Sequence, residues 1–105
     1  MYRMLYILFL SFIFSSDYSL KDLNPSSNTS QNLVGPSYFS DKVTIHYFGH
    51  YSWGLCTIRA GQLNAMQTDF LNAGISDVQF ILLAKSQHSS SISNWIDSND
   101  IPVVQ

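Results

Sequence analysis

Charged residues are scarce in this chain. Lysine, arginine, aspartate and glutamate together make up 11% of its 105 residues, and the formal net charge is −2. Soluble domains carry roughly 25% charged residues. A protein that binds nucleic acid or an anionic membrane surface needs a broad basic surface, which this composition does not provide. We therefore expect a single domain with no nucleic-acid partner.

The chain also lacks a hydrophobic run long enough to cross a membrane. Its most apolar segment, Met4–Phe14, is well short of the roughly 20 residues that a spanning helix needs. Arg3 precedes this run and small residues follow it, which is the pattern of a secretory signal peptide. A buried core helix is the weaker alternative, because the run has no polar face. We predict a signal peptide over residues 1–19, cleaved between Ser15 and Ser19, and a secreted, extracellular protein.

Cysteine is almost absent. Cys56 is the single cysteine of the sequence, so no disulfide can form within the chain. In a secreted protein, a lone cysteine indicates an intermolecular disulfide or a reactive thiol, unless the residue is a small buried hydrophobe. Composition alone leaves these three alternatives open.

The segment after the predicted signal peptide has little regular patterning. Leu20–Ser40 is rich in serine, asparagine, proline and glycine, and we predict an extended leader that is mostly loop. It contains Asn28-Thr29-Ser30, an acceptor sequence for N-linked glycosylation. A surface loop of a secreted protein is the right context for this modification, so we expect a glycan on Asn28.

Three segments have the composition of β-strands. Val43–Phe48 alternates β-branched and aromatic residues, and Val78–Ala84 is a nearly continuous apolar run of strand length. Such a run is typical of a strand buried on both faces of a parallel sheet. Ile101–Val104 is the third candidate, with Pro102 at its start or on a sheet edge.

Two helices are expected between these strands. From Cys56 onward, apolar residues recur at steps of three and four, and they form a stripe of Leu63, Met66, Phe70 and Ala73. Gly74 should end this helix as its C-terminal cap. A second, short helix is expected over Ser91–Ser98, where the apolar positions are Ile92, Trp95 and Ile96.

The order of elements is therefore β-α-β-α-β, with parallel strands joined by right-handed crossovers. Three parallel strands leave a long unpaired edge, which stable domains usually cover. We therefore expect residues 41–105 to be the N-terminal part of a domain that is incomplete at its C-terminus.

The turn between the first strand and the first helix is the candidate site. Trp53 and Cys56 have the spacing of a thioredoxin-type redox pair, at a helix start that follows a strand. Free N–H groups and the partial positive charge at a helix N-terminus stabilise thiolates and bind anions. The first position, however, is a tryptophan, which performs no thiol chemistry. From the spacing alone, an inert, buried Cys56 is the favoured interpretation.

Residues 43–105 resemble the N-terminal domain of the selenoprotein P family, which is thioredoxin-like and secreted. The resemblance rests on the strand "VTIHYF", on Trp53-Gly54-Leu55-Cys56 and on the strand "VQFILLA", with "IPV" at the end. The family holds selenocysteine where this chain has Trp53, in a pair whose second member matches Cys56. The resemblance implies that residue 53 attacks a peroxide or disulfide substrate and that Cys56 resolves the product. Selenium, as selenocysteine, would be the only cofactor element.

Two accounts of Trp53 remain open. The codon UGA encodes selenocysteine in selenoproteins and differs from the tryptophan codon in its last base. Residue 53 is therefore a decoded UGA, or it is a genuine tryptophan. In the first case the domain is a selenium-containing redox protein of the antioxidant type. In the second it is a redox-inactive, thioredoxin-like binding or remnant domain, with Trp53 as a surface anchor.

The chain departs from the selenoprotein P family in two respects, and few residues outside the turn are candidates for the site. The segment between the last two strands is shorter than in the family, and the histidine-rich, selenocysteine-rich tail is missing, so selenium transport has no support. His46 and His50 lie across a strand end and a turn, without a third ligand, so we expect no metal site. His50 lies close enough in sequence to residue 53 to favour an anion there. Arg59 is expected to be solvated, and a contact with a thiolate is the alternative.

Overall fold

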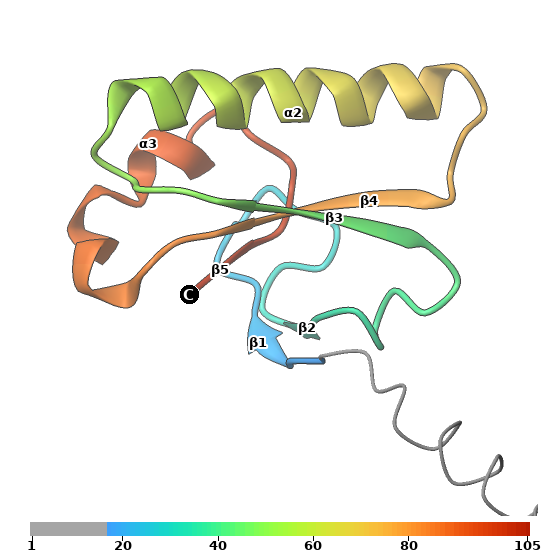
Figure 1. The fold of residues 1–105 in the computed structure, drawn as a ribbon, viewed down its shortest axis with the longest axis horizontal. Helices are drawn as coiled ribbons and strands as arrows, with labels where there is room; N and C mark the ends of the chain where they lie inside the picture. The colour runs from blue at the N-terminus through green and yellow to red at the C-terminus, as the bar shows by residue number, and fades with distance from the viewer. Residues whose placement is uncertain (1–16) are drawn as a thin grey trace, which may run out of the picture.

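The computed structural model describes residues 17–105, so most of the predicted signal peptide lies outside the described range (Figure 1). The centre of the fold is a parallel sheet in the order β3-β4-β5. Its strands are Val43–Phe48, Val78–Leu83 and Val103–Val104. This architecture confirms the prediction of a mixed α/β fold with parallel strands.

Strand β4 occupies the middle of the sheet. It pairs with β3 from Val43↔Val78 to Phe48↔Leu83, and with β5 at Leu82↔Val103 and Leu83↔Val104. Three of its residues, Phe80, Ile81 and Leu82, are buried. Their side chains alternate between the two faces, so a central strand with both faces covered needs the continuous apolar run that the sequence shows.

Helix α2, Gly54–Asn72, lies across one face of the sheet (Figure 1). Cys56 and Ala60 are buried on it, and Leu63 and Phe70 pack against the same core. The predicted stripe was wrong at Met66, whose side chain is 45% exposed, and at Ala73, which is exposed at the C-cap position. At 100° per residue, Met66 is rotated by about 80° from Cys56, so it lies on the flank of the helix.

A polar residue of α2 also faces the sheet. Gln67 Nε2 donates to the Val78 carbonyl oxygen at 2.9 Å, and the Phe80 N–H donates to Gln67 Oε1 at 2.9 Å. These two bonds satisfy backbone groups at the start of β4 and fix the helix along the strand. The apolar pattern alone gives no sign of them.

Gly74 ends α2 as predicted. Its φ is +81°, its N–H donates to the Leu71 carbonyl at 3.1 Å, and the Ile75 N–H donates to the Phe70 carbonyl at 2.8 Å. This pair of bonds is the Schellman motif, and glycine adopts the required left-handed backbone without the steric cost that a Cβ imposes.

Alanine substitutions at two glycines of this region should have opposite effects. A Cβ at Gly74 or at Gly61 meets no atom within 4 Å, so the backbone conformation alone determines how alanine changes the stability. We expect Gly74→Ala to lower the free energy of unfolding by about 1–2 kcal/mol, because its φ is positive. Gly61→Ala, inside α2, should raise it by about 0.5–1 kcal/mol. Urea unfolding of both variants measures these changes, and equal effects at the two positions would contradict the assignment of the cap.

The chain returns to the sheet through short helical turns. A 3-10 helix, η3, spans Ser86–Ser91, and helix α3 spans Ser93–Ile96, so helical structure begins earlier than the predicted Ser91–Ser98 helix. Trp95 is 1% exposed, and its ring contacts that of Tyr51 edge-on at 4.8 Å. The short α3 therefore fixes the end of the sheet where the candidate site lies.

The predicted leader is part of the folded unit. It is mostly turns, as expected, but it also forms the antiparallel strands β1, Leu20–Lys21, and β2, Leu33–Val34. Figure 1 shows this segment on the face of the sheet opposite α2. There Val34 and Phe39 form a second core with Ile81 and Val104. The leader thus supplies the second layer over the sheet, which the sequence did not indicate.

Hydrogen bonds attach the leader to β5. The Leu23 N–H donates to the Val103 carbonyl at 2.8 Å, and Asp22 Oδ1 accepts from the Val103 N–H at 3.1 Å. Asn24 Nδ2 donates to the carbonyls of Asn99 at 2.6 Å and Ile101 at 2.8 Å. This edge of the sheet is therefore covered, whereas β3 forms the other edge. Within residues 17–105, no helix has both the length and the apolar composition needed to cross a bilayer.

Candidate redox turn and cleft

The candidate site lies where β3 and β4 end and α2 begins. The Gly49 N–H donates to the Leu83 carbonyl at 3.0 Å, which holds the turn against β4. The Trp53 N–H donates to the His50 carbonyl at 3.2 Å. Trp53 is the N-cap residue of α2, with extended backbone angles (φ −86°, ψ 121°) and no side-chain cap. The first N–H groups of the helix therefore lack a capping side chain.

Trp53 and Cys56 lie together but differ in exposure. The Trp53 side chain is 63% exposed, whereas Cys56 is 7% exposed and belongs to the core beneath it. Both line one cleft of about 590 Å³, together with Lys85, His88 and Gln105. The structure thus brings the two predicted site residues to a single cleft, with an exposed first position and a shielded second one.

Three rings form one side of the cleft. The His50 ring stacks on the Trp53 indole at 5.0 Å with an interplanar angle of 5°, and the His88 ring lies 3.8 Å from His50. The Ser52 N–H donates to His50 Nδ1 at 3.1 Å, which requires an unprotonated Nδ1. The expected proximity of His50 to residue 53 is therefore present.

Desolvation lowers the pKa of His50, and His88 and Lys85 lower it further. The depressed pKa and the bond from Ser52 both favour a neutral imidazole. The sequence alone singled out neither His88 nor Lys85 as a residue of the site. Their position directly after β4 was the only available signal, because the carboxyl ends of parallel strands meet at one edge.

The His50 pKa provides a direct test of this cluster. We expect His50 to titrate below the ordinary histidine pKa, since desolvation and the neighbouring His88 and Lys85 oppose its protonation. His88→Gln should raise the pKa of His50, and Lys85→Gln should raise it less, following the order of the causes. NMR titration of the imidazole carbon-bound protons measures both shifts. An unchanged pKa in His88→Gln would show that the two rings are not in contact.

Cys56 has a neighbour that the sequence did not identify. Hydrogen bonding with the Cys56 thiol is the largest cause that raises the pKa of the Tyr47 hydroxyl, followed by burial. Tyr47 lies on β3, on the face covered by α2, and packs against the core that contains Cys56. Cys56 therefore has the Tyr47 hydroxyl as a neighbour and also lines the cleft.

The remaining predicted residues lie elsewhere. The Arg59 guanidinium is exposed and donates to Gln62 Oε1 at 3.2 Å, so it does not line the cleft. His46 lies against Tyr18, with ring centroids 5.6 Å apart, and not beside His50. Among residues 17–105, no group of three or more histidine, cysteine, aspartate or glutamate side chains is placed to hold a metal ion. Asn28 is exposed on a leader turn, away from the cleft.

Two comparisons of the sequence with known proteins gave no match. No protein-family model matches the chain, and no curated protein matches it. The resemblance to the selenoprotein P family therefore rests on the residues of the sequence itself.

Proposed function

We propose that this chain is a secreted, thioredoxin-like redox domain of the selenoprotein P type, in which residue 53 attacks the substrate and Cys56 resolves the product. The observation that carries the proposal is the difference in exposure at the start of α2. Residue 53 faces solvent at the mouth of the cleft, and Cys56 lies shielded three residues later. A two-centre redox site needs this arrangement, because the attacking group must meet the substrate and the resolving group must not.

The surroundings of the turn support this chemistry. Helix α2 has 19 residues and no acidic residue in its first turn, so its N-terminal partial charge is not neutralised there. Lys85 lies in the same cleft. An anion on residue 53 or on Cys56 would be stabilised by both, which lowers the pKa of the attacking group and keeps it reactive at neutral pH. Thioredoxin-like folds carry such a turn in a parallel β-α-β unit, and β3-α2-β4 is a unit of this kind.

Selenocysteine fits at position 53. The indole of Trp53 is mostly exposed and is absent from both core clusters, so a smaller side chain there leaves the core intact. A selenolate supplies a nucleophile that a peroxide or a disulfide oxidises by two electrons. The Cys56 thiol then attacks the selenium and forms the Se–S bond, and its proton leaves with the displaced group, which is water after a peroxide or the substrate's thiol after a disulfide. Two thiols of an external reductant restore both groups and leave as a disulfide, so the electrons balance.

Thiol-dependent peroxide reduction tests the proposal. Chain produced with selenocysteine at position 53 should consume hydrogen peroxide in the presence of a dithiol, and Cys56→Ser should lower the turnover at least tenfold. Chain with tryptophan at position 53 should be inactive. Equal turnover in the selenocysteine and tryptophan forms would contradict the proposal, as would an unaffected Cys56→Ser variant.

One observation favours the alternative of a redox-inactive binding domain. The Trp53 indole lies parallel to His50 at the edge of the cleft, as a preformed aromatic surface that a partner could cover. In this case Cys56 would be a buried thiol or form an intermolecular disulfide. A genuine tryptophan in the natural protein, together with a loss of partner binding in Trp53→Ala, would establish this function.

A further inference from the structure

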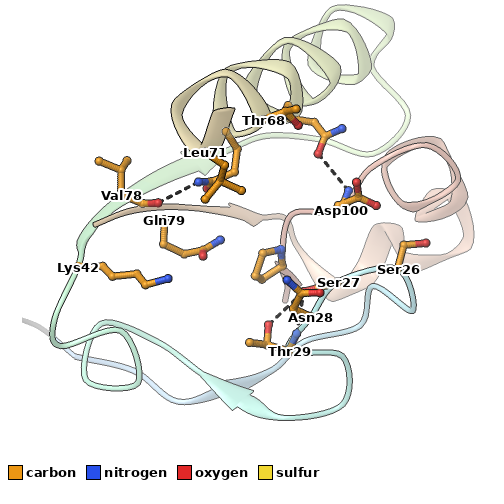
Figure 2. Close-up of a pocket in the computed structure, with 13 residues that line it drawn as sticks. Ser26, Ser27, Asn28, Thr29, Lys42, Thr68, Leu71, Val78, Gln79 and Asp100 are labelled. Carbon is orange, nitrogen blue, oxygen red and sulfur yellow. Dashed lines mark hydrogen bonds between the residues drawn. The ribbon is translucent and has the colours of Figure 1, made fainter. Parts of the chain in front are cut away.

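A second cavity, of about 460 Å³, lies at the other end of β4, away from Cys56. It is bounded by the leader turn around Asn28, by Lys42, by the second half of α2 and by the start of β4. Figure 2 shows Asn28, Lys42 and Gln79 around one space, with Thr68 and Leu71 on the helix above it. The redox proposal assigns no role to this cavity.

The lining of this cavity is suited to a sugar. It combines hydroxyl and amide side chains with one ammonium and one carboxylate group, and with the apolar surfaces of Leu71, Val78 and Pro102. An apolar ligand would cover the Lys42 ammonium and the Asp100 carboxylate without offering either a hydrogen bond, which is costly. A sugar ring presents hydroxyl groups at its edge and C–H groups on its faces, so it can satisfy both kinds of surface.

The leader turn holds Asn28 at the edge of this cavity. The Ser30 N–H donates to the Ser27 carbonyl at 3.1 Å. Thr29 Oγ1 donates to Asp22 Oδ2 at 2.7 Å, and Asp22 is fully buried. These bonds tie both residues that follow Asn28 to the folded leader. Asn28 is exposed and lines the cavity, and it is also the predicted acceptor of an N-linked glycan.

We propose that the cavity binds the first N-acetylglucosamine residues of a glycan attached to Asn28 of the same chain. Because the glycan is attached to a residue that lines the cavity, its sugars reach the cavity at a high effective concentration. The cavity is therefore occupied even if each sugar contact is weak. Lys42 Nζ would donate to sugar hydroxyl or acetamido oxygens, and Gln79 Oε1 would accept from a sugar hydroxyl or the acetamido N–H. The docked glycan would join the leader to α2 and β4. The proposal rests on the secretion proposed above, because glycosylation requires the secretory pathway.

A double-mutant comparison tests this docking. Ser30→Ala removes the acceptor sequence and keeps the backbone bond of Ser30, so it provides an unglycosylated reference. We expect the secreted, glycosylated protein to unfold about 4 °C above Ser30→Ala. Lys42→Ala should remove at least half of this difference, by lowering the Tm of the glycosylated chain alone. Lys21 is an exposed lysine of the leader that does not line the cavity. Lys21→Ala should therefore leave the Tm of the glycosylated chain and of Ser30→Ala unchanged, or lower both by the same amount.

The outcomes separate this inference from the proposed function. A glycan present by intact mass, with equal effects of Lys42→Ala in both backgrounds, would overturn the docking and leave the redox domain standing. A secreted chain without a glycan would also overturn only the docking. A chain retained inside the cell would contradict the proposed secretion and remove the basis of the docking with it.

Discussion

Trp53→Cys should convert this chain into an active thiol–disulfide oxidoreductase. The substitution places a thiol at the exposed N-cap of α2, three residues before the shielded Cys56. A cysteine at such a helix start has its pKa lowered to between about 3.5 and 7.5, so a substantial fraction is thiolate at neutral pH. Oxidation should then link residues 53 and 56. We expect disulfide reduction with a dithiol to exceed that of the tryptophan chain by at least tenfold.

Two control variants test whether the activity of Trp53→Cys depends on the geometry of the turn. Trp53→Cys combined with Cys56→Ser keeps the attacking thiol but cannot resolve the mixed disulfide, so turnover should fall to the tryptophan level. Leu55→Cys adds an exposed thiol in the same turn, at a position that does not pair with Cys56 across a helical turn. Activity in Leu55→Cys equal to that in Trp53→Cys would contradict the assignment of residue 53 as the attacking position.

Asp22→Ala should destabilise the fold more than any substitution at the cleft. The carboxylate is fully buried in the leader. Its Oδ1 accepts from the Asn24 N–H at 3.0 Å and from the Val103 N–H at 3.1 Å, and its Oδ2 accepts from Thr29. Alanine leaves these donors without their partner, and each buried donor left unsatisfied costs about 1–3 kcal/mol. We expect a loss of about 3 kcal/mol in the free energy of unfolding, measured by urea unfolding.

The matched control for this prediction is Asp41→Ala. Asp41 is exposed in the segment that leads into β3, so its replacement should change the unfolding free energy by less than about 0.5 kcal/mol. The same loss in both variants would indicate a general effect of charge. A small effect of Asp22→Ala would show that the fold does not depend on the bonds between the leader and β5.

The elements that local sequence determines were predictable. Strand β3 has the predicted bounds, and β4 ends one residue before the predicted end. Gly74 ended α2 as expected, because a cap depends on a few neighbouring residues. The exposure of Met66 was not predicted, since apolar character at a helical step does not say which part of the face is covered.

The contacts that position the leader and complete the cleft were not predictable. Asp22 and Val103 are 81 residues apart, and nothing in the composition of a serine- and asparagine-rich segment indicates such a bond. His88 lies on η3, which follows β4, and its ring reaches that of His50 in the turn after β3. The prediction that Trp53 and Cys56 lie together at a helix start, in contrast, is confirmed, because the start of one helix fixes the positions of both.

The chemical identity of residue 53 in the natural protein tests the central proposal most directly. Intact-mass and selenium measurements on protein isolated from its own cells report this residue without any substitution. We expect one selenium atom per chain, located by fragmentation at position 53 and bonded to the Cys56 sulfur in the oxidised protein. A selenium-free chain with tryptophan at position 53 would contradict the redox proposal and leave the binding domain in its place.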